Sequence, residues 1–123
     1  MITFEPIGVV RTPFESPEDA PRQGLDDEVT GTIVIDRAYE AGLAGLAAGD
    51  RIDVVWVADR ADRSVLRVRA GNRGVFATRS PDRPNPICVS PCTVCDVAGR
   101  RLAVTGVDAV DGSPVLDLKA GFR

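Results

Sequence analysis

The chain has 123 residues, 44% of them hydrophobic and 27% charged, with a formal net charge of −3 at neutral pH. This length suits one domain, over residues 1–123, and no apolar run reaches the roughly 18 residues of a membrane span. No basic region precedes an apolar one at the N-terminus, and three cysteines are an odd number, so we expect neither a signal peptide nor a disulfide framework, and a cytoplasmic location.

The charge is unevenly distributed along the chain. Between Arg60 and Ile87, seven arginines stand against two aspartates, so this segment carries +5 and the remainder −8. A strongly basic segment in an acidic protein indicates an anionic partner, such as phosphate, a carboxylate or RNA. The alternative is that some of these arginines pair with the acidic remainder.

Three strands are expected in the first half of the chain, at residues 6–14, 28–37 and 50–60. Pro13 ends the first, because proline cannot donate a ladder hydrogen bond. The second alternates with a period of two residues, which is typical of a half-buried strand. The third is almost continuously apolar and therefore predicts a buried strand with Trp56 in the core.

One helix is expected, in residues 37–49. Asp36 is a good N-cap residue, and a glycine at the end of the segment can stop the helix. Tyr39, Leu43 and Leu46 would then lie on one helical face.

The remaining strands are expected at residues 64–70, 92–97 and 101–110, the last two joined by a tight turn. In the first of these, strict alternation places Arg67 and Arg69 on the same face. About six short strands and one helix predict a mainly β protein, either a small β-barrel or a strongly bent sheet.

A long proline-rich segment, residues 71–91, separates two of these strands. Its four prolines restrict the backbone, and loops of this length in compact domains are usually functional or disordered. Its apolar residues argue against disorder, so we expect an ordered binding loop. Within it, Phe76 is a candidate to stack on a base or, alternatively, to anchor the loop on the domain.

The three cysteines follow a Cys-x3-Cys-x2-Cys spacing, which is also used by enzymes that hold a four-iron cluster. Their neighbours favour a strand, in which Cys88 and Cys92 would share a face about 13 Å apart and Cys95 would point the other way. Such thiols cannot share one cluster. We therefore expect small buried hydrophobic residues and no metal.

Residues 74–87, GVFATRSPDRPNPI, resemble the signature of the TsaA-like family, represented by the tRNA methyltransferase TrmO. Further likenesses follow in the family's order along the chain. They are PIGVVRTPF at the start, APRQG at 20–24, VTGTIVIDRAYEAGLAGL at 29–46 and GVDAVDGSPVLDLK at 106–119.

The resemblance implies a small β-barrel that binds S-adenosylmethionine without a Rossmann glycine loop and is usually a homodimer. Characterised members methylate the exocyclic nitrogen of threonylcarbamoyladenosine beside the tRNA anticodon, so tRNA is the expected partner. The positions implied to contact the cofactor are Pro21, Arg22, Gln23, Asp59, Arg60, Arg79, Val89, Asp108, Ala109, Val110 and Asp111.

Individual roles follow from side-chain chemistry. Arg22 or Arg79 suits the carboxylate of the cofactor, and Asp108 or Asp111 suits its ammonium group or ribose hydroxyls. The candidates for phosphate contacts in RNA are Arg67, Arg69, Arg73 and Arg83, with Arg60 and Arg63 as further possibilities.

A general base would help to deprotonate a carbamoylated nitrogen, and the chain has no histidine. The candidates are Asp59 and Asp82, if burial lets them hold a proton near neutrality. Each has an arginine beside it, Arg60 or Arg83, and a salt bridge with that neighbour is the alternative.

The chain also departs from the family pattern. Asp59 stands where the family often has histidine, and Cys88 stands where glycine is usual. Two alternatives to tRNA methylation follow: a methyltransferase of the same fold that acts on a small molecule, or a non-catalytic module that binds S-adenosylmethionine or RNA.

Overall fold

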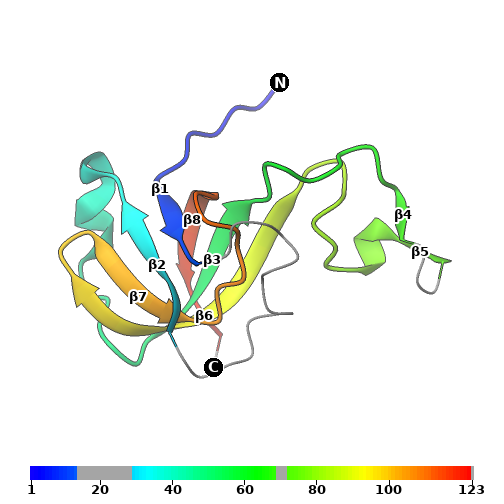
Figure 1. The fold of residues 1–123 in the computed structure, drawn as a ribbon. Coiled ribbons are helices and arrows are strands. Elements are labelled where there is room, and N and C mark those ends of the chain that lie inside the picture. The colour runs from blue at the N-terminus through cyan, green and yellow to red at the C-terminus, as the bar shows by residue number, and fades with distance from the viewer. Residues whose placement is uncertain (14–28, 69–71, 123) are drawn as a thin grey trace.

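The structure, a computed structural model, describes residues 1–13, 29–68 and 72–122. Six antiparallel strands close into a barrel in the order β1-β2-β7-β6-β3-β8 (Figure 1). The mainly β fold and the barrel expected from the sequence are confirmed. The strands are β1 (Gly8–Arg11), β2 (Val29–Ile35), β3 (Arg51–Val57), β6 (Ile87–Ala98), β7 (Arg101–Thr105) and β8 (Pro114–Ala120).

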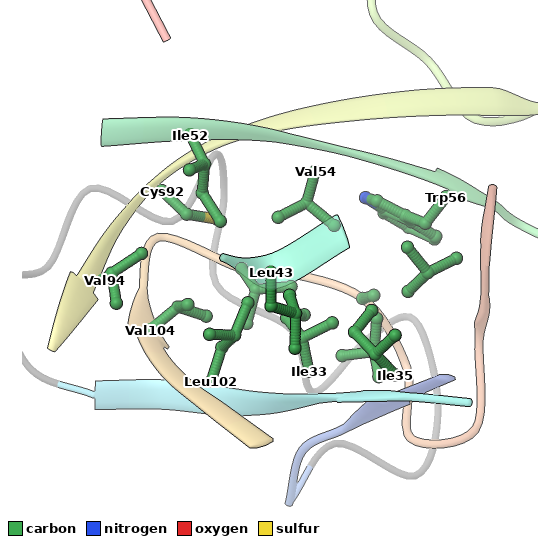
Figure 2. Packing of buried hydrophobic residues seen from close by; sticks show 14 residues of the cluster. Ile33, Ile35, Leu43, Ile52, Val54, Trp56, Cys92, Val94, Leu102 and Val104 are labelled. Carbon is green, nitrogen blue, oxygen red and sulfur yellow. The ribbon is translucent and has the colours of Figure 1, made fainter. Parts of the chain in front are cut away.

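The barrel core is built by the two-residue alternation of its strands. In β2, Ile33 and Ile35 are buried, and in β3 the inward positions are Ile52, Val54 and Trp56. Figure 2 shows these side chains converging inside the barrel. Full burial of one such aliphatic side chain contributes about 1.5–3 kcal/mol, so this alternation also supplies most of the hydrophobic stabilisation.

The expected helix is shorter and tighter than the sequence pattern suggested. A 3₁₀-helix, η3, spans Arg37–Leu43, and Asp36 occupies its N-cap position without a capping side-chain hydrogen bond. Leu43 enters the core while Tyr39 is exposed. Gly45, with φ of +94°, turns the chain away before residue 49, because its backbone lies in the left-handed region. No helix in the described ranges is long and apolar enough to span a membrane.

The strand expected at residues 64–70 is wrong at its start, because residues 64–66 are not in a strand. β4 (Arg67–Val68) pairs with β5 (Arg73–Gly74) outside the barrel, and residues 69–71 lie outside the described residues. The sixth barrel strand is instead β8, which pairs with β1 and β3 and closes the sheet. The strand expected at residues 101–110 ends at Thr105, where the chain enters the loop that leads to β8.

Residues 58–86 leave the barrel between β3 and β6 and return to it, and we call this segment the arm (Figure 1). Its outgoing and returning limbs are joined by hydrogen bonds. The Ala58 backbone N–H donates to the Pro86 carbonyl at 2.9 Å, and the Arg63 Nε donates to the Pro84 carbonyl at 2.7 Å. The ordered loop expected over residues 71–91 is present from residue 72, but it ends at Pro86 because β6 begins at Ile87. Residue 71 lies outside the described residues.

The tip of the arm holds β4, β5 and a short 3₁₀-helix, η5 (Val75–Ala77). Asn72 adopts a positive φ of 48°, a conformation that asparagine tolerates better than most residues. Its side-chain oxygen accepts a hydrogen bond from Arg67 Nη1 at 3.3 Å. Phe76 is 83% exposed, so the anchoring role considered for it is wrong within this chain.

Candidate functional site

A pocket of about 980 Å³ lies where the base of the arm meets β6 and the loop between β7 and β8. This loop spans residues 106–113, and we call it the β7–β8 loop. The pocket brings together most of those predicted site residues that the structure describes. Those that line it are Asp59, Arg60, Arg79, Asp82, Arg83, Val89, Asp108 and Val110.

Two hydrogen bonds connect the barrel wall to the Asp108 carboxylate in the pocket. The Trp56 Nε1–H donates to Ser90 Oγ at 2.9 Å, and Ser90 Oγ donates to Asp108 Oδ1 at 2.7 Å. Trp56 and Ser90 are 7% and 4% exposed. Trp56 was predicted to lie in the core, which is confirmed, and it also lines the pocket. Ser90 lines the pocket too, although no sequence pattern pointed to it.

Arg79 lies at the pocket edge, in the returning limb of the arm. Its Nη1 donates to the backbone carbonyl of Val89 at 3.2 Å, which holds the exposed guanidinium beside β6. A guanidinium has five N–H donors in a planar fork, so Arg79 can also bind a carboxylate. Val89 and Ile87, which are both partly exposed, add apolar surface to the same wall.

Arg83 is half-buried and bonds to the backbone of the arm. Its Nη2 donates to the backbone carbonyls of Val75 and Thr78, the second at 2.6 Å, and its Nε is buried without a hydrogen-bond partner. Arg67 and Arg73, in contrast, are exposed on the tip of the arm. Arg83 is thus engaged by backbone carbonyls of its own chain, while Arg67 bonds to the Asn72 side chain and Arg63 to Pro84 and Asn85. Arg69 lies outside the described residues.

The two candidate bases differ in their surroundings. Asp59 is exposed, so the burial on which its role as a base was conditional is absent. Asp82 is half-buried, and its Oδ1 accepts a hydrogen bond from the Asp62 backbone N–H at 2.9 Å. Since Asp82 bonds to Asp62 and Arg83 to loop carbonyls, the alternative of an Asp82–Arg83 salt bridge is wrong.

The cofactor contacts expected over residues 108–111 are only partly brought together. Asp108 and Val110 line the pocket, whereas Ala109 is fully buried in the core. Asp111 instead ties the β7–β8 loop to β1: its Oδ1 accepts from the Thr12 backbone N–H at 3.1 Å, and its Oδ2 lies 3.6 Å from Arg11 Nη1. The expected contacts Pro21, Arg22 and Gln23 lie outside the described residues.

The cysteines point as the strand pattern predicted, with Cys88 and Cys92 inward and Cys95 on the other face of β6. The burial expected for all three is wrong for Cys95, which is exposed. Burial, together with the charge of Asp108, raises the pKa of Cys88 to about 11 and that of Cys92 to about 12. Both thiols are therefore protonated at neutral pH. No cluster of three potential metal ligands occurs among the residues that the structure describes.

A basic arm, a closed barrel and a pocket with both a carboxylate and a guanidinium define a small β-barrel built to bind a ligand of mixed charge. The family of the tRNA-methyltransferase O N-terminal domain matches residues 9–122, nearly the whole chain. The chain belongs to this family.

Similar proteins of comparable length come from archaea. A protein of Halobacterium salinarum named "Probable S-adenosyl-L-methionine-binding protein" is 53% identical over 116 residues, which cover 93% of this chain and 94% of the relative. An "S-adenosyl-L-methionine-binding protein" of Archaeoglobus fulgidus is 44% identical over 120 residues, with coverage of 94% and 86%.

The fold also matches solved structures. A crystal structure of TrmO has a TM-score of 0.84 at 31% identity and covers 99% of this chain, and TrmO from Pseudomonas aeruginosa has a TM-score of 0.82 at the same identity. This chain spans 58% and 56% of those two chains, so it corresponds to little more than half of them.

Proposed function

We propose that this chain is an S-adenosylmethionine-dependent methyltransferase that N6-methylates threonylcarbamoyladenosine beside the tRNA anticodon, and that it works as a homodimer. The observation that carries the proposal is the position of the mixed-charge pocket at the base of the basic arm, in a chain of this family. The names of the archaeal relatives support the same cofactor.

The residues of the pocket fit S-adenosylmethionine, which has a carboxylate, an ammonium group, a sulfonium, a ribose and an adenine. The volume of the pocket lies at the upper end of the usual range of about 300–1,000 Å³ for small-molecule sites. Arg79 suits the carboxylate because a guanidinium can donate two parallel hydrogen bonds to it, as a bidentate donor. Asp108 suits the ammonium group or a ribose hydroxyl, and Ile87 and Val89 supply apolar surface for the adenine.

When bound, the cofactor supplies an electrophilic methyl group, and the protein's own task is to hold the acceptor nitrogen in line with it. Positioning two reactants in this way can contribute about 7–11 kcal/mol. Asp82 is half-buried in the pocket wall, so it is the better placed of the two candidates to take up the proton of the nitrogen. Asp59, which also lines the pocket but is exposed, is the second candidate.

The arm provides the surface for RNA. Arg67 and Arg73 are exposed at its tip and can contact phosphates, which position an RNA without reading its sequence. Phe76 stands between them and the pocket in sequence and is 83% exposed, as a side chain that stacks on a base must be. The arm would thereby hold an anticodon loop next to the cofactor.

Calorimetric titration of S-adenosylmethionine into the wild-type protein and Arg79→Ala tests the cofactor. We expect saturable binding near one site per chain, weakened at least tenfold in Arg79→Ala, because a charge-assisted contact is lost. Arg37→Ala, an exposed arginine of η3 outside the pocket, is the matched control. No binding by the wild type would overturn the cofactor assignment.

A methyl-transfer assay tests the substrate. We expect label from methyl-labelled S-adenosylmethionine in tRNA that carries threonylcarbamoyladenosine, and none in the same tRNA lacking the modification. Label that appears in a pool of metabolites but not in tRNA would mean that the methyl acceptor is a small molecule and not tRNA. Cofactor binding without any methyl transfer would mean that the protein is a non-catalytic module that binds S-adenosylmethionine.

A further inference from the structure

The hydrogen bonds from Trp56 through Ser90 to Asp108 have a fixed direction. An indole N–H can only donate, so Ser90 Oγ is the acceptor of that bond. The one hydroxyl proton of Ser90 is then directed to Asp108 Oδ1, 2.7 Å away. The carboxylate is therefore held as an acceptor, which suits the cationic or hydroxyl groups of a ligand.

We infer that Ser90 is a positioning residue of the pocket, which orients the Asp108 carboxylate toward the ligand, with Trp56 orienting Ser90. The ligand named in the tests, S-adenosylmethionine, rests on the proposed function. The hydrogen-bonded chain itself does not, since it is a property of the protein without ligand.

The strand register makes Trp56 and Ser90 neighbours. Trp56 pairs with Cys88 across β3 and β6, and Ser90 follows two residues later on the same inward face. Trp56 and Ser90 are thus diagonal neighbours, which lie within reach of a large aromatic side chain. Both are buried, so water competes little for their hydrogen bonds.

Asp108 needs such support because it stands on a loop and not on a strand. The β7–β8 loop is fastened on its far side, where Thr12 Oγ1 donates to the Ala109 carbonyl at 2.8 Å and Asp111 bonds to the Thr12 backbone. On the pocket side, the hydrogen bond from Ser90 to the Asp108 side chain holds the β7–β8 loop. Loss of the Ser90 hydroxyl therefore leaves the loop attached but the carboxylate free to turn.

Nuclear magnetic resonance tests the chain of hydrogen bonds without any ligand. The protein has one tryptophan, so its indole ¹H–¹⁵N correlation is a single signal that reports on Trp56. We expect Ser90→Ala to move this signal upfield, because the hydrogen bond from Nε1 is lost, and Asp108→Asn to move it less. An indole signal that stays in place in Ser90→Ala would overturn the inference.

A double-mutant cycle tests whether Ser90 acts through Asp108. We expect Ser90→Ala to weaken S-adenosylmethionine binding about tenfold, the usual effect of losing a hydrogen bond to a charged group. In an Asp108→Ala background the same change should weaken binding less than twofold. If it still costs about tenfold there, Ser90 contacts the ligand directly or only supports the fold, and the positioning role is wrong.

Trp56→Phe keeps the test possible if Ser90→Ala does not fold, because phenylalanine retains an aromatic ring but has no N–H donor. We expect it to weaken binding severalfold in the wild-type background and to have no further effect beside Asp108→Ala. An equal loss in both backgrounds would contradict the inference. Failure of the wild-type protein to bind S-adenosylmethionine would instead remove the proposed function, while the indole signal would still decide whether the chain of hydrogen bonds exists.

Discussion

Arg83 and Thr78 are joined by a hydrogen bond of 2.6 Å from the guanidinium Nη2 to the backbone carbonyl, and the same nitrogen donates to the carbonyl of Val75. These carbonyls belong to η5 and the residue that follows it. Proline-rich backbone offers few N–H donors, so a side chain here supplies the donors that a neighbouring strand supplies in a sheet. Arg83 is therefore one of the residues that hold the arm together, in addition to Arg63, which bonds to the Pro84 carbonyl.

Arg83→Lys should loosen the arm and leave the barrel folded. Lysine keeps the charge but cannot reach two carbonyls with a planar fork, so residues 75–80 should exchange amide hydrogen at least tenfold faster. Hydrogen exchange followed by mass spectrometry measures this, with peptides from β2 and β7 as an internal reference. Arg73→Lys, an exposed arginine of the same arm, is the control. Unchanged exchange in residues 75–80 would show that the arm keeps its structure without the Arg83 guanidinium.

The exposed arginines at the tip of the arm should contribute to RNA binding through phosphates. Each phosphate contact releases counterions, so Arg67→Ala and Arg73→Ala should each lower the slope of log affinity against log salt by about one. Fluorescence anisotropy with a labelled anticodon stem-loop at several salt concentrations measures the slope. Lys119→Ala, an exposed cation of β8, should leave it unchanged. An unaltered slope in both arm variants would place the RNA elsewhere.

Much of the barrel could be predicted from the sequence, because strands with one buried face carry a two-residue period. The alternation through Ile33 and Ile35 and through Ile52, Val54 and Trp56 is what the structure buries. β8 was missed because it follows the turn-rich DGSP sequence and begins with Pro114, a poor strand signal. The helix was overestimated because Gly42 and Gly45 interrupt a pattern of otherwise helical period.

The candidate site was predictable where a motif lies continuously in the chain. The segment around Arg79 and Asp82 was expected to form an ordered binding loop, and it forms one wall of the pocket. The contact between Trp56 and Ser90 joins residues 34 positions apart and exists only through the β3–β6 register. No local pattern reports that register. The one available signal was the inward alternation of Trp56 in its strand.

The two inward-facing thiols should make the protein less stable at alkaline pH. A thiol in the unfolded chain has an ordinary pKa of 9.0. Below this pH the two thiols are protonated in both the folded and the unfolded state, so their full contribution to the free energy of unfolding is present. Above pH 9.0 the unfolded thiols ionise first, because burial keeps the pKa of Cys88 near 11 and that of Cys92 near 12. The free energy of unfolding then falls until the pH passes those folded values.

Urea unfolding at pH 8 and pH 10.5 measures this effect. Relative to Cys92→Ala, the wild-type protein should lose about 2 kcal/mol more between these pH values, the cost of keeping one thiol protonated 1.5 pH units above its unfolded pKa. Cys95→Ser, on the exposed face of β6, should behave as the wild type does. An equal loss in Cys92→Ala would mean that Cys92 ionises in the folded barrel as readily as in the unfolded chain.

Gly31 should be required for β2 to pack beside β1 and the β7–β8 loop. A Cβ atom at this position would stand 2.7 Å from Thr12 Cγ2, 2.8 Å from Val107 Cγ1 and 2.9 Å from the backbone oxygen of Arg11. Since one of these neighbours is backbone, the strands must separate, and Gly31→Ala should lower the free energy of unfolding by about 1–3 kcal/mol. Gly42→Ala is the matched control, because a Cβ atom there meets nothing within 4 Å, and it should change stability by less than about 0.5 kcal/mol. Equal urea midpoints for the two variants would mean that the barrel adjusts to the added methyl group without cost.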